Sequence, residues 1–461
     1  MRNIHPLGRA GRAVCTVGLT VGTLLATAVG GTATASAQRA PRLPYAGKVL
    51  TVLAPAAAAG AAAQYNAYYA AIAKQFHVQT GATVKWDLFS SSSQESSIIQ
   101  TAIVSGSGPD LINYGSGFAG TFYATGDFVQ YTPSDWNAVG GRSSFIQAML
   151  AQAGPDANHD IGIPMLDVPY VIAYNKTLFA KAGITSPPTT WTQWVEDAQK
   201  IQKADPHVYG AGFDPADSFD PWKFLWSYSA QLGGGFLSPN GKKATFTSKP
   251  MEEAMDFYFA QYYKYHIVPP GSLTWDDGEM VSAFLKGQVA MLPIANESTL
   301  REAAGTPIAK DIAFAPLPNV PYGMSKRPHG GTAAESIVGT LYWGVPKYAA
   351  STMPLALQLV KASISPEVDI KMYQLAGWFP VTKSGLSLIA KKFPSTKLFL
   401  KIISESQPYG FTPAWSAIET GLGTVVNSLA SHLATTGAWS QSYMDSQLAT
   451  LNATVQSQLG A

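Results

Sequence analysis

Cysteine, charge and long hydrophobic runs are all scarce in this sequence. Its 461 residues include one cysteine, and 13% of them are charged, whereas 46% are hydrophobic. Beyond the first 37 residues, no segment reaches the roughly 18 apolar residues that a membrane-spanning helix needs. At about 100 to 200 residues per domain, the length predicts two to four domains in a globular chain with a weakly charged surface.

The first 37 residues lack acidic side chains and are typical of an export signal. Three arginines precede an apolar core at 14–29, and Ala35-Ser36-Ala37 has the small residues of a cleavage site. We therefore expect an exported, extracytoplasmic protein (secreted or cell-envelope associated) that is cleaved near Ala37. Residues 38–47 would follow as a flexible lead-in.

Removing this leader makes the chain almost neutral. It takes away three arginines and leaves 28 basic against 29 acidic residues. A neutral protein has no general attraction for nucleic acid or for an anionic membrane, so neither is an expected partner. The one cysteine, Cys15, lies near the start of the apolar core, and we assign it to the leader because a lipid-anchor cysteine normally follows that core. The mature chain would then form no disulfide bond.

Strand and helix patterns alternate from Lys48 onward. The expected strands are 49–53, 83–89 and 110–114, and the expected helices are 65–76 and 98–103. This βαβαβ order favours a parallel sheet with helices on both faces. Ligands bind beyond the carboxyl ends of such strands, which makes the loops 54–60, 90–94 and 115–118 candidate ligand loops.

A second alternating set follows a crossing at 164–169, where Asp167 and Pro169 interrupt an apolar run. We expect helices at 191–203, 222–232 and 251–265, and extended segments at 208–213, 289–294, 312–317 and 337–345. After Pro380 the pattern is mostly helical to the end. The whole chain is therefore predicted to be α/β.

Five short motifs occur in an order that resembles one known family. They are SGSGPDLINYG (105–115), the run 172–183 followed by Pro188-Thr189-Thr190-Trp191, AFLKGQVAMLP (283–293), FAPLP (314–318) and the turn 377–381. In this order they resemble the extracellular solute-binding proteins of ABC importers, family 1, which includes the maltose-binding protein. The resemblance implies a two-lobed periplasmic-binding-protein fold of type II, in which each lobe is a mainly parallel sheet flanked by helices.

The resemblance also implies where the lobes begin and end. Lobe one would comprise 48–164 and 324–374, lobe two 168–317 and 380–461, with hinge segments near 165–167, 318–323 and 375–379. A ligand that contacts both lobes would favour the closed state by its differential affinity.

The function that the resemblance implies is capture of a carbohydrate, which we expect to be an oligosaccharide, and its delivery to the permease subunits of an ABC importer. The protein would be a monomer without cofactor or metal, and it would not be an enzyme. Sugar sites combine aromatic rings with carboxylates and amides. Carried over position by position, the candidate ligand contacts are Ser92, Tyr114, Ser116, Asp167, Asp220, Trp222, Asn296, Glu297, Gly331, Trp378 and Trp415.

Several of these patterns also have a purely structural interpretation. Asp167 could cap or stiffen the hinge instead of contacting ligand. Trp226, one helical turn after Trp222, is expected in the core. Asp110 is expected to accept backbone hydrogen bonds, and the loop 156–160 lacks the glycine of a calcium loop and is expected to be a solvated turn.

Two departures leave the ligand class open. The loop 56–63 is almost all alanine, and the tryptophan that the family often has near Asn296 is absent. A polyamine or another small polar solute therefore stays a possible ligand of the same fold. A secreted glycosidase is the alternative class, with Asp276, Asp277 and Glu279 as its acids. These acids precede a helix, where carboxylates are favoured in any case.

Overall fold

The computed structural model describes residues 43–56, 62–89, 92–217, 221–334, 336–337 and 339–460. The expected export signal at 1–37 lies outside these residues, as do Asp220 and residues 57–61. From Leu43 onward the chain forms one compact unit.

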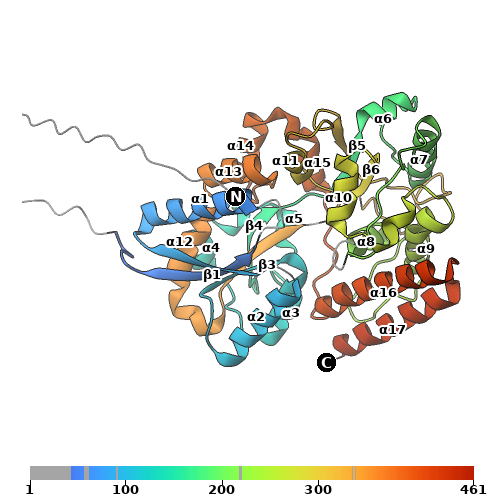
Figure 1. Ribbon diagram of the computed structural model, residues 1–461. Helices are drawn as coiled ribbons and strands as arrows, with labels where there is room; N and C mark the ends of the chain where they lie inside the picture. Colours follow the sequence, from blue (N-terminus) through green and yellow to red (C-terminus); the bar gives the residue numbers. More distant parts are fainter. Residues whose placement is uncertain are drawn as a thin grey trace, which may run out of the picture. The chain divides into compact units, whose positions relative to one another are not determined.

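The described residues contain two sheets, one of five strands and one of three (Figure 1). The strands are β1 (Val49–Pro55), β2 (Thr83–Phe89), β3 (Leu111–Gly115), β4 (Ile163–Asp167), β5 (Val171–Asn175), β6 (Met291–Ala295), β7 (Ile312–Ala315) and β8 (Thr340–Gly344). Their order is β2-β1-β3-β8-β4 in the first sheet and β6-β5-β7 in the second.

The first sheet is parallel at one end and antiparallel at the other. β1 pairs in parallel with β2 and β3, because the helices α1 (Ala62–Thr80) and α2 (Ser92–Ser105) return the chain between successive strands. The expected βαβαβ unit is thereby confirmed. β8 arrives from far along the chain and runs antiparallel to β3 and β4. Since Gly115 pairs with Leu341, the loop after β3 lies beside the start of β8.

The second sheet corrects the expectation that each lobe has a mainly parallel sheet. β5 runs antiparallel to both of its neighbours, β6 and β7. The expected strand at 208–213 is reduced to a single bridge between Tyr209 and Val289. The sequence pattern predicts that these segments are extended, but it does not contain the direction in which distant segments pair.

The helices expected at 191–203, 222–232 and 251–265 are confirmed, as is the mostly helical chain after Pro380, and several helices have clear start or stop signals. Asp276 begins α10 with a capping box closed by Glu279, and left-handed glycines end α13 and α16. The helices are α3 (Ala119–Thr125), α4 (Pro133–Ala138), α5 (Gln147–Leu150), α6 (Lys176–Lys181), α7 (Trp191–Ala204), α8 (Pro221–Gln231), α9 (Lys249–Tyr263), α10 (Asp277–Leu285), α11 (Ser298–Glu302), α12 (Met353–Ser363), α13 (Pro366–Ala376), α14 (Lys383–Lys392), α15 (Lys397–Glu405), α16 (Trp415–Thr436) and α17 (Gln441–Leu459).

Two large hydrophobic cores divide the structure into two lobes. The first core joins β1, β4 and β8 to α1, α12 and α13, with Leu50, Ile72 and Leu359 fully buried. The second core joins β5 to α7, α8, α9, α16 and α17, with Trp191 and Trp194 fully buried. In Figure 1, α16 and α17 lie side by side along lobe two. We call the part built on the first sheet and first core lobe one, and the other part lobe two.

The limits of the lobes differ from those expected from the sequence. Helices α14 and α15 pack in the first core through Ile389, Phe399 and Ile402, although the expectation put all of 380–461 in lobe two. Conversely, Tyr322 stacks on Phe257 of the second core, at 5.7 Å between ring centroids. Neither 318–323 nor 375–379 is therefore a crossing between the cores.

The chain crosses between the cores at three places that lie next to one another, near 167–170, 336–340 and 405–414. Ser336 links all three, because its Oγ accepts from the Tyr170 amide at 3.1 Å and its carbonyl accepts from the Gln407 amide at 3.2 Å. The Val168 amide donates to the Gly339 carbonyl at 3.1 Å. We call this arrangement the three-segment junction.

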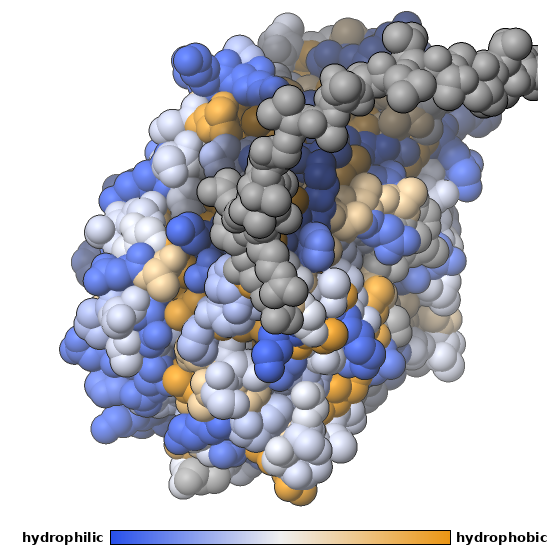
Figure 2. Space-filling model, turned by 90° about the vertical axis from the view of Figure 1, so that its left-hand side faces the viewer, coloured by the Kyte–Doolittle hydropathy of each residue, from blue (hydrophilic) through white to orange (hydrophobic). Residues whose placement is uncertain are grey.

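Hydrophobic residues are scattered over the face in Figure 2 among hydrophilic ones. Across the described part of the chain, no helix combines the length and the apolar character needed to cross a membrane.

Candidate functional site

A small cavity of about 70 Å³ lies between the two lobes, beside the three-segment junction. Its wall comes from the loop after β3, the chain entering β8 and three parts of lobe two. The lining residues are Gly115, Ser116, Gly117, Phe118, Tyr170, Trp222, Gly339, Thr340, Leu341, Tyr409, Trp415 and Glu419.

Lobe one contributes the turn that follows β3. Ser116 begins a short 3₁₀ helix there, and its hydroxyl lies 2.5 Å from the Tyr409 hydroxyl. Gly117 follows, and a Cβ at this position would lie 1.9 Å from Nε1 of Trp415. Only glycine permits this close approach of the turn to the indole ring.

Lobe two contributes three aromatic rings that contact one another. The ring of Trp222 lies 4.9 Å from that of Tyr409 and 4.8 Å from that of Trp415, and the rings of Tyr409 and Trp415 are 4.4 Å apart. Trp222 is placed by the amino end of α8, and Trp415 by the amino end of α16. Together the rings offer a cluster of apolar faces beside polar groups.

A buried lysine and several carboxyl groups lie behind these rings. Lys223 is 2% exposed, and its ammonium lies 4.9 Å from the centre of the Tyr170 ring. Burial lowers the pKa of Lys223, whereas four nearby carboxylates raise it; they are Asp217, Asp277, Glu419 and Asp214. Burial also raises the pKa of Asp214, and the neighbouring charges of Asp277 and Asp217 raise it further.

The acids considered for a glycosidase have divided roles. Asp276 accepts from the Glu279 amide at 2.9 Å, and Glu279 accepts in return from the Asp276 amide at 3.1 Å. These two residues therefore form the capping box of α10, as the structural interpretation predicted. Asp277 instead belongs to the group of carboxylates around Lys223, and burial raises its pKa.

Three of the expected ligand contacts, Ser116, Trp222 and Trp415, lie together in the wall of the cavity. Ser92 begins α2, and its side chain lies outside the described structure. Asp220 lies outside the described residues altogether.

Tyr114 and Asp167 are buried away from the cavity wall. Tyr114 is fully buried in a cluster with Phe122 and Tyr342, because neighbouring residues of β3 face opposite sides of the sheet. Asp167 is 1% exposed and accepts from the Thr340 hydroxyl at 2.8 Å. Burial raises the pKa of Asp167 to about 6. The structure thus gives both residues a role in packing.

Asn296, Glu297 and Gly331 also make contacts within the protein. Asn296 accepts from the Ser298 amide at 2.9 Å, and Glu297 accepts from the Tyr373 hydroxyl at 2.5 Å. A Cβ on Gly331 would lie 2.1 Å from the carbonyl oxygen of Gln231, so this glycine permits close packing within lobe two.

Trp378 lies at the edge of α1 and is 8% exposed. Its ring packs edge-on against Tyr65 at 4.7 Å and against Tyr68 at 5.9 Å.

Among the structural interpretations, Trp226 lies in the second core, and Asp110 accepts from the Thr51 amide at 2.8 Å. Both are confirmed.

Sequence reasoning missed Tyr170, Lys223, Tyr409 and Glu419. One signal was available for Lys223, because it is the only charged residue in the otherwise uncharged segment 221–231, and every residue of α8 is buried. Tyr170 and Tyr409 lie on crossing segments, and their approach to the cavity depends on contacts between distant parts of the chain.

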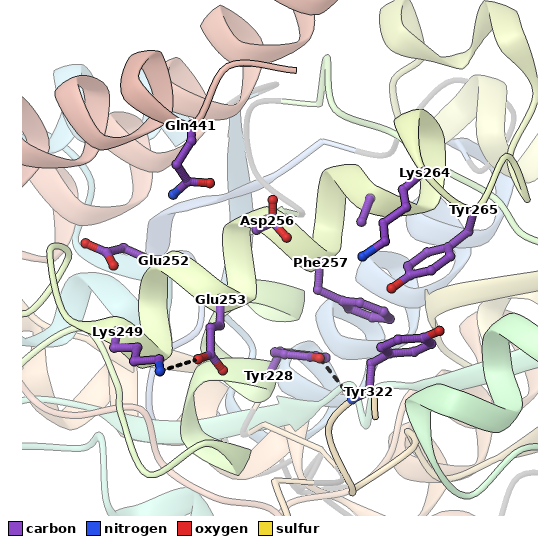
Figure 3. Close-up of a pocket in the computed structure, with 11 residues that line it drawn as sticks. Tyr228, Lys249, Glu252, Glu253, Asp256, Phe257, Lys264, Tyr265, Tyr322 and Gln441 are labelled. Atoms are coloured by element: carbon purple, nitrogen blue, oxygen red, sulfur yellow. Dashed lines mark hydrogen bonds and ion pairs between the residues drawn. The ribbon is translucent and has the colours of Figure 1, made fainter. Parts of the chain in front are cut away.

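A larger hollow of about 430 Å³ lies on lobe two, along α9 (Figure 3). Phe257, Tyr265 and Tyr322 line one end, and Lys249 forms an ion pair of 3.5 Å with Glu253 at the other. All of its lining residues belong to lobe two or to the segment packed on it. The smaller cavity is the better candidate site because both lobes build it.

No group of histidine, cysteine, aspartate or glutamate suited to a metal ion occurs in the described ranges. In the loop 156–160, Asp156 accepts from the Asn158 amide at 2.8 Å and contacts His159 at 2.7 Å. Its side chain is 53% exposed, as expected for a solvated turn.

Comparisons with known proteins identify the family. Residues 59–370, more than half of the chain, match the sequence model of the family described as bacterial extracellular solute-binding protein. A putative binding protein of Brucella abortus (strain 2308) is 24% identical over 248 residues, which are 52% of this chain and 55% of the relative. The chain thus spans about half the length of this curated relative.

Two solved structures are similar over nearly their whole length. Maltose-bound MalE3 of T. maritima has a TM-score of 0.72 and 18% identity, over 87% of this chain and 98% of that one. An ABC transporter solute-binding protein from Thermotoga lettingae, bound with α-D-tagatose, has a TM-score of 0.71 and 22% identity, over 90% and 100%. At these identities the likeness shows the fold, and the expected two-lobed α/β architecture is confirmed.

Proposed function

Because the chain belongs to the bacterial extracellular solute-binding proteins, which are binding proteins and not enzymes, we propose that it captures a carbohydrate for an ABC importer. The observation that carries this proposal is the cavity between the lobes, with the rings of Trp222, Tyr409 and Trp415 in its wall. Aromatic rings bind the apolar faces of sugar rings, while hydroxyl and carboxylate groups such as those of Ser116 and Glu419 bind sugar hydroxyls.

The similar structures support this ligand class without defining it. The T. maritima protein is bound to maltose and the Thermotoga lettingae protein to α-D-tagatose. We propose that the present chain likewise takes a sugar, expected to be an oligosaccharide, and that as a monomer it delivers this sugar to a membrane permease.

Binding requires the lobes to move apart. A cavity of about 70 Å³ is far smaller than the roughly 300 to 1,000 Å³ of typical small-molecule sites. We propose that the three-segment junction is the hinge, with crossings at 167–170, 336–340 and 405–414. A sugar that contacts both lobes would then shift the population toward the closed state.

The first experiment tests binding with isothermal titration calorimetry against neutral oligosaccharides, together with mass spectrometry of ligand released from the denatured protein. A neutral sugar that binds without turnover would support the proposal. Released polyamine, with no response to any sugar, would favour the same fold serving another solute.

The same titration tests the aromatic wall. Trp222→Ala should weaken sugar binding at least tenfold, about 1.4 kcal/mol, because a ring face is lost. Trp439→Ala is the matched control, since Trp439 stacks on Phe259 and Tyr263 of lobe two and does not line the cavity. Equal affinities of the two folded variants would remove Trp222 from the site.

A further inference from the structure

A short segment of the third crossing lies between the two lobes, beside the cavity. It comprises residues 409–413, which we call the strap. Tyr409, at its start, lines the cavity and packs against Trp222 and Trp415 of lobe two, at ring distances of 4.9 and 4.4 Å. Directly after the strap, Ala414 and Trp415 are buried in the second core. Both ends of the strap are therefore held by lobe two.

The middle of the strap is nevertheless bonded to lobe one. Besides the hydroxyl pair at the cavity, two hydrogen bonds join them. The carbonyl of Gly410 accepts from Nε2 of Gln152 at 3.2 Å, and the carbonyl of Pro413 accepts from the hydroxyl of Thr121 on α3 at 3.0 Å. These four residues do not line the cavity, so the two bonds join lobe to lobe without involving the ligand site.

The strap also packs closely on α3. The ring of Phe411 lies edge-on to that of Tyr123 at 5.8 Å, beside the buried cluster of β1, β3 and β8. A Cβ on Gly120 would lie 2.2 Å from the carbonyl oxygen of Thr412 and 2.6 Å from its amide nitrogen. Alanine is favoured over glycine inside a helix, so the close approach of the strap backbone explains a glycine at this position of α3.

Opening of the lobes has to break these contacts, because the ends of the strap follow lobe two while its partners belong to lobe one. The cavity of about 70 Å³ is far smaller than the roughly 300 to 1,000 Å³ of typical small-molecule sites. A ligand can therefore enter only after the strap has left α3. A single hydrogen bond shifts an equilibrium by roughly two- to tenfold, so the strap contacts together weigh on the balance between open and closed forms.

We propose that the strap fastens the lobes to each other through protein groups alone, and that its release from α3 controls when the ligand site becomes accessible. The inference rests on the proposed function, in which the lobes open about the three-segment junction. A sugar would add its contacts to a closed form that the strap already favours. The strap would then govern access to the site, whereas the cavity wall would select the solute.

The test measures the distance between the lobes without any added solute. Cys15 is the only cysteine, so Cys15→Ser gives a chain in which two spin labels can be placed at will. Val104→Cys on α2 and Ala434→Cys on α16 provide an exposed label site on each lobe. Double electron–electron resonance between them gives the ratio of open to closed molecules. In this parent chain we expect the short, closed distance to predominate.

Two further changes loosen the strap in different ways. Gly120→Ala places a methyl group against the strap backbone, and Thr121→Val removes the donor to Pro413 while keeping the shape of the side chain. We expect each change to raise the ratio of open to closed molecules at least threefold. Thr125→Val is the matched control, because the Thr125 hydroxyl donates within α3 at 2.8 Å, and it should leave the ratio unchanged.

An unchanged ratio in Gly120→Ala and Thr121→Val would overturn the inference, provided that their melting temperatures show folded proteins, and so would a parent chain that is wholly open. The sugar titration separates this result from the proposed function. A protein that binds no neutral sugar but opens in both variants would keep the strap and lose the carbohydrate function. Sugar binding with unchanged distances in both variants would keep that function and overturn the role of the strap.

Discussion

Asp369 on α13 is a buried carboxyl group whose surroundings favour its neutral form. It is 2% exposed, and burial raises its pKa to about 7, from about 3.9 for an exposed aspartate. The packing around it is tight, since a Cβ on Gly385 would lie 2.6 Å from its Oδ2. Its charge would also act on the buried Tyr68. The folded state therefore binds a proton that the unfolded chain releases at lower pH.

This proton gives Asp369 a defined effect on stability. The pKa of Asp369 is higher in the folded state than in the unfolded state. Its contribution to the free energy of unfolding is therefore complete below about pH 4, falls as the pH rises to about 7, and is constant above that. One pKa unit corresponds to about 1.4 kcal/mol. Asp369→Asn keeps a neutral side chain, so its melting temperature should exceed that of the wild type by several degrees at pH 8 and approach it near pH 4.

Thermal melts from pH 4 to pH 8 check this expectation. Asp445→Asn, on the exposed surface of α17, is the control and should follow the wild type at every pH. Parallel curves for Asp369→Asn and wild type would show that Asp369 ionises in the folded protein as it does in the unfolded chain.

At the scale of single elements, the helices α13 and α16 end in the same way but in different surroundings. Gly377 ends α13 with φ 73° and Gly437 ends α16 with φ 69°. A Cβ on Gly377 would lie 2.8 Å from the backbone carbon of Glu297, whereas nothing lies within 4 Å of one on Gly437. The end of α13 is thus packed directly against the loop that follows β6.

These two caps form a matched pair of substitutions. Gly437→Ala should lower the free energy of unfolding by about 1 kcal/mol, since alanine disfavours positive φ. Gly377→Ala should lower it by at least another ~1 kcal/mol, because the backbone at Glu297 must also move. Urea unfolding of both variants measures the difference. Equal losses of unfolding free energy in the two variants would mean that the backbone at Glu297 moves away from a Cβ at Gly377 without an energetic cost.

Elements were predictable where their signals are local. The strand expected at 83–89 is β2 in full, and the proline and capping signals place the starts of α7 and α10. The pairing within lobe two was not predictable, because β5 lies between strands that follow it by more than a hundred residues. The helices at 383–405 were assigned to the wrong lobe for a similar reason, since their apolar faces do not specify which core they join.

At the scale of the whole molecule, the candidate site is a cavity whose wall is built by both lobes. Ser116, Trp222 and Trp415 could be predicted because motif positions mark the loops that carry them. Tyr170 and Tyr409 could not, because the crossing segments carry them to the cavity. The contact of lobe one with Trp415 at Gly117 could not be predicted from the sequence either, and it leaves no room for a Cβ at Gly117.

A methyl group at this contact should therefore push the Trp415 ring away from Gly117 and hold the lobes further apart. The Cβ of Gly117→Ala would meet the Trp415 ring at 1.9 to 2.5 Å, and the backbone there needs no positive φ, so the clash is the whole effect of the change. We expect the variant without ligand to have a larger radius of gyration by small-angle scattering, and to bind the cognate ligand at least tenfold more weakly, because closure is opposed. Gly271→Ala, with open space around its Cβ and no positive φ, should change neither quantity. If Gly117→Ala scatters and binds like the wild type, Trp415 moves aside without cost and the contact does not limit closure.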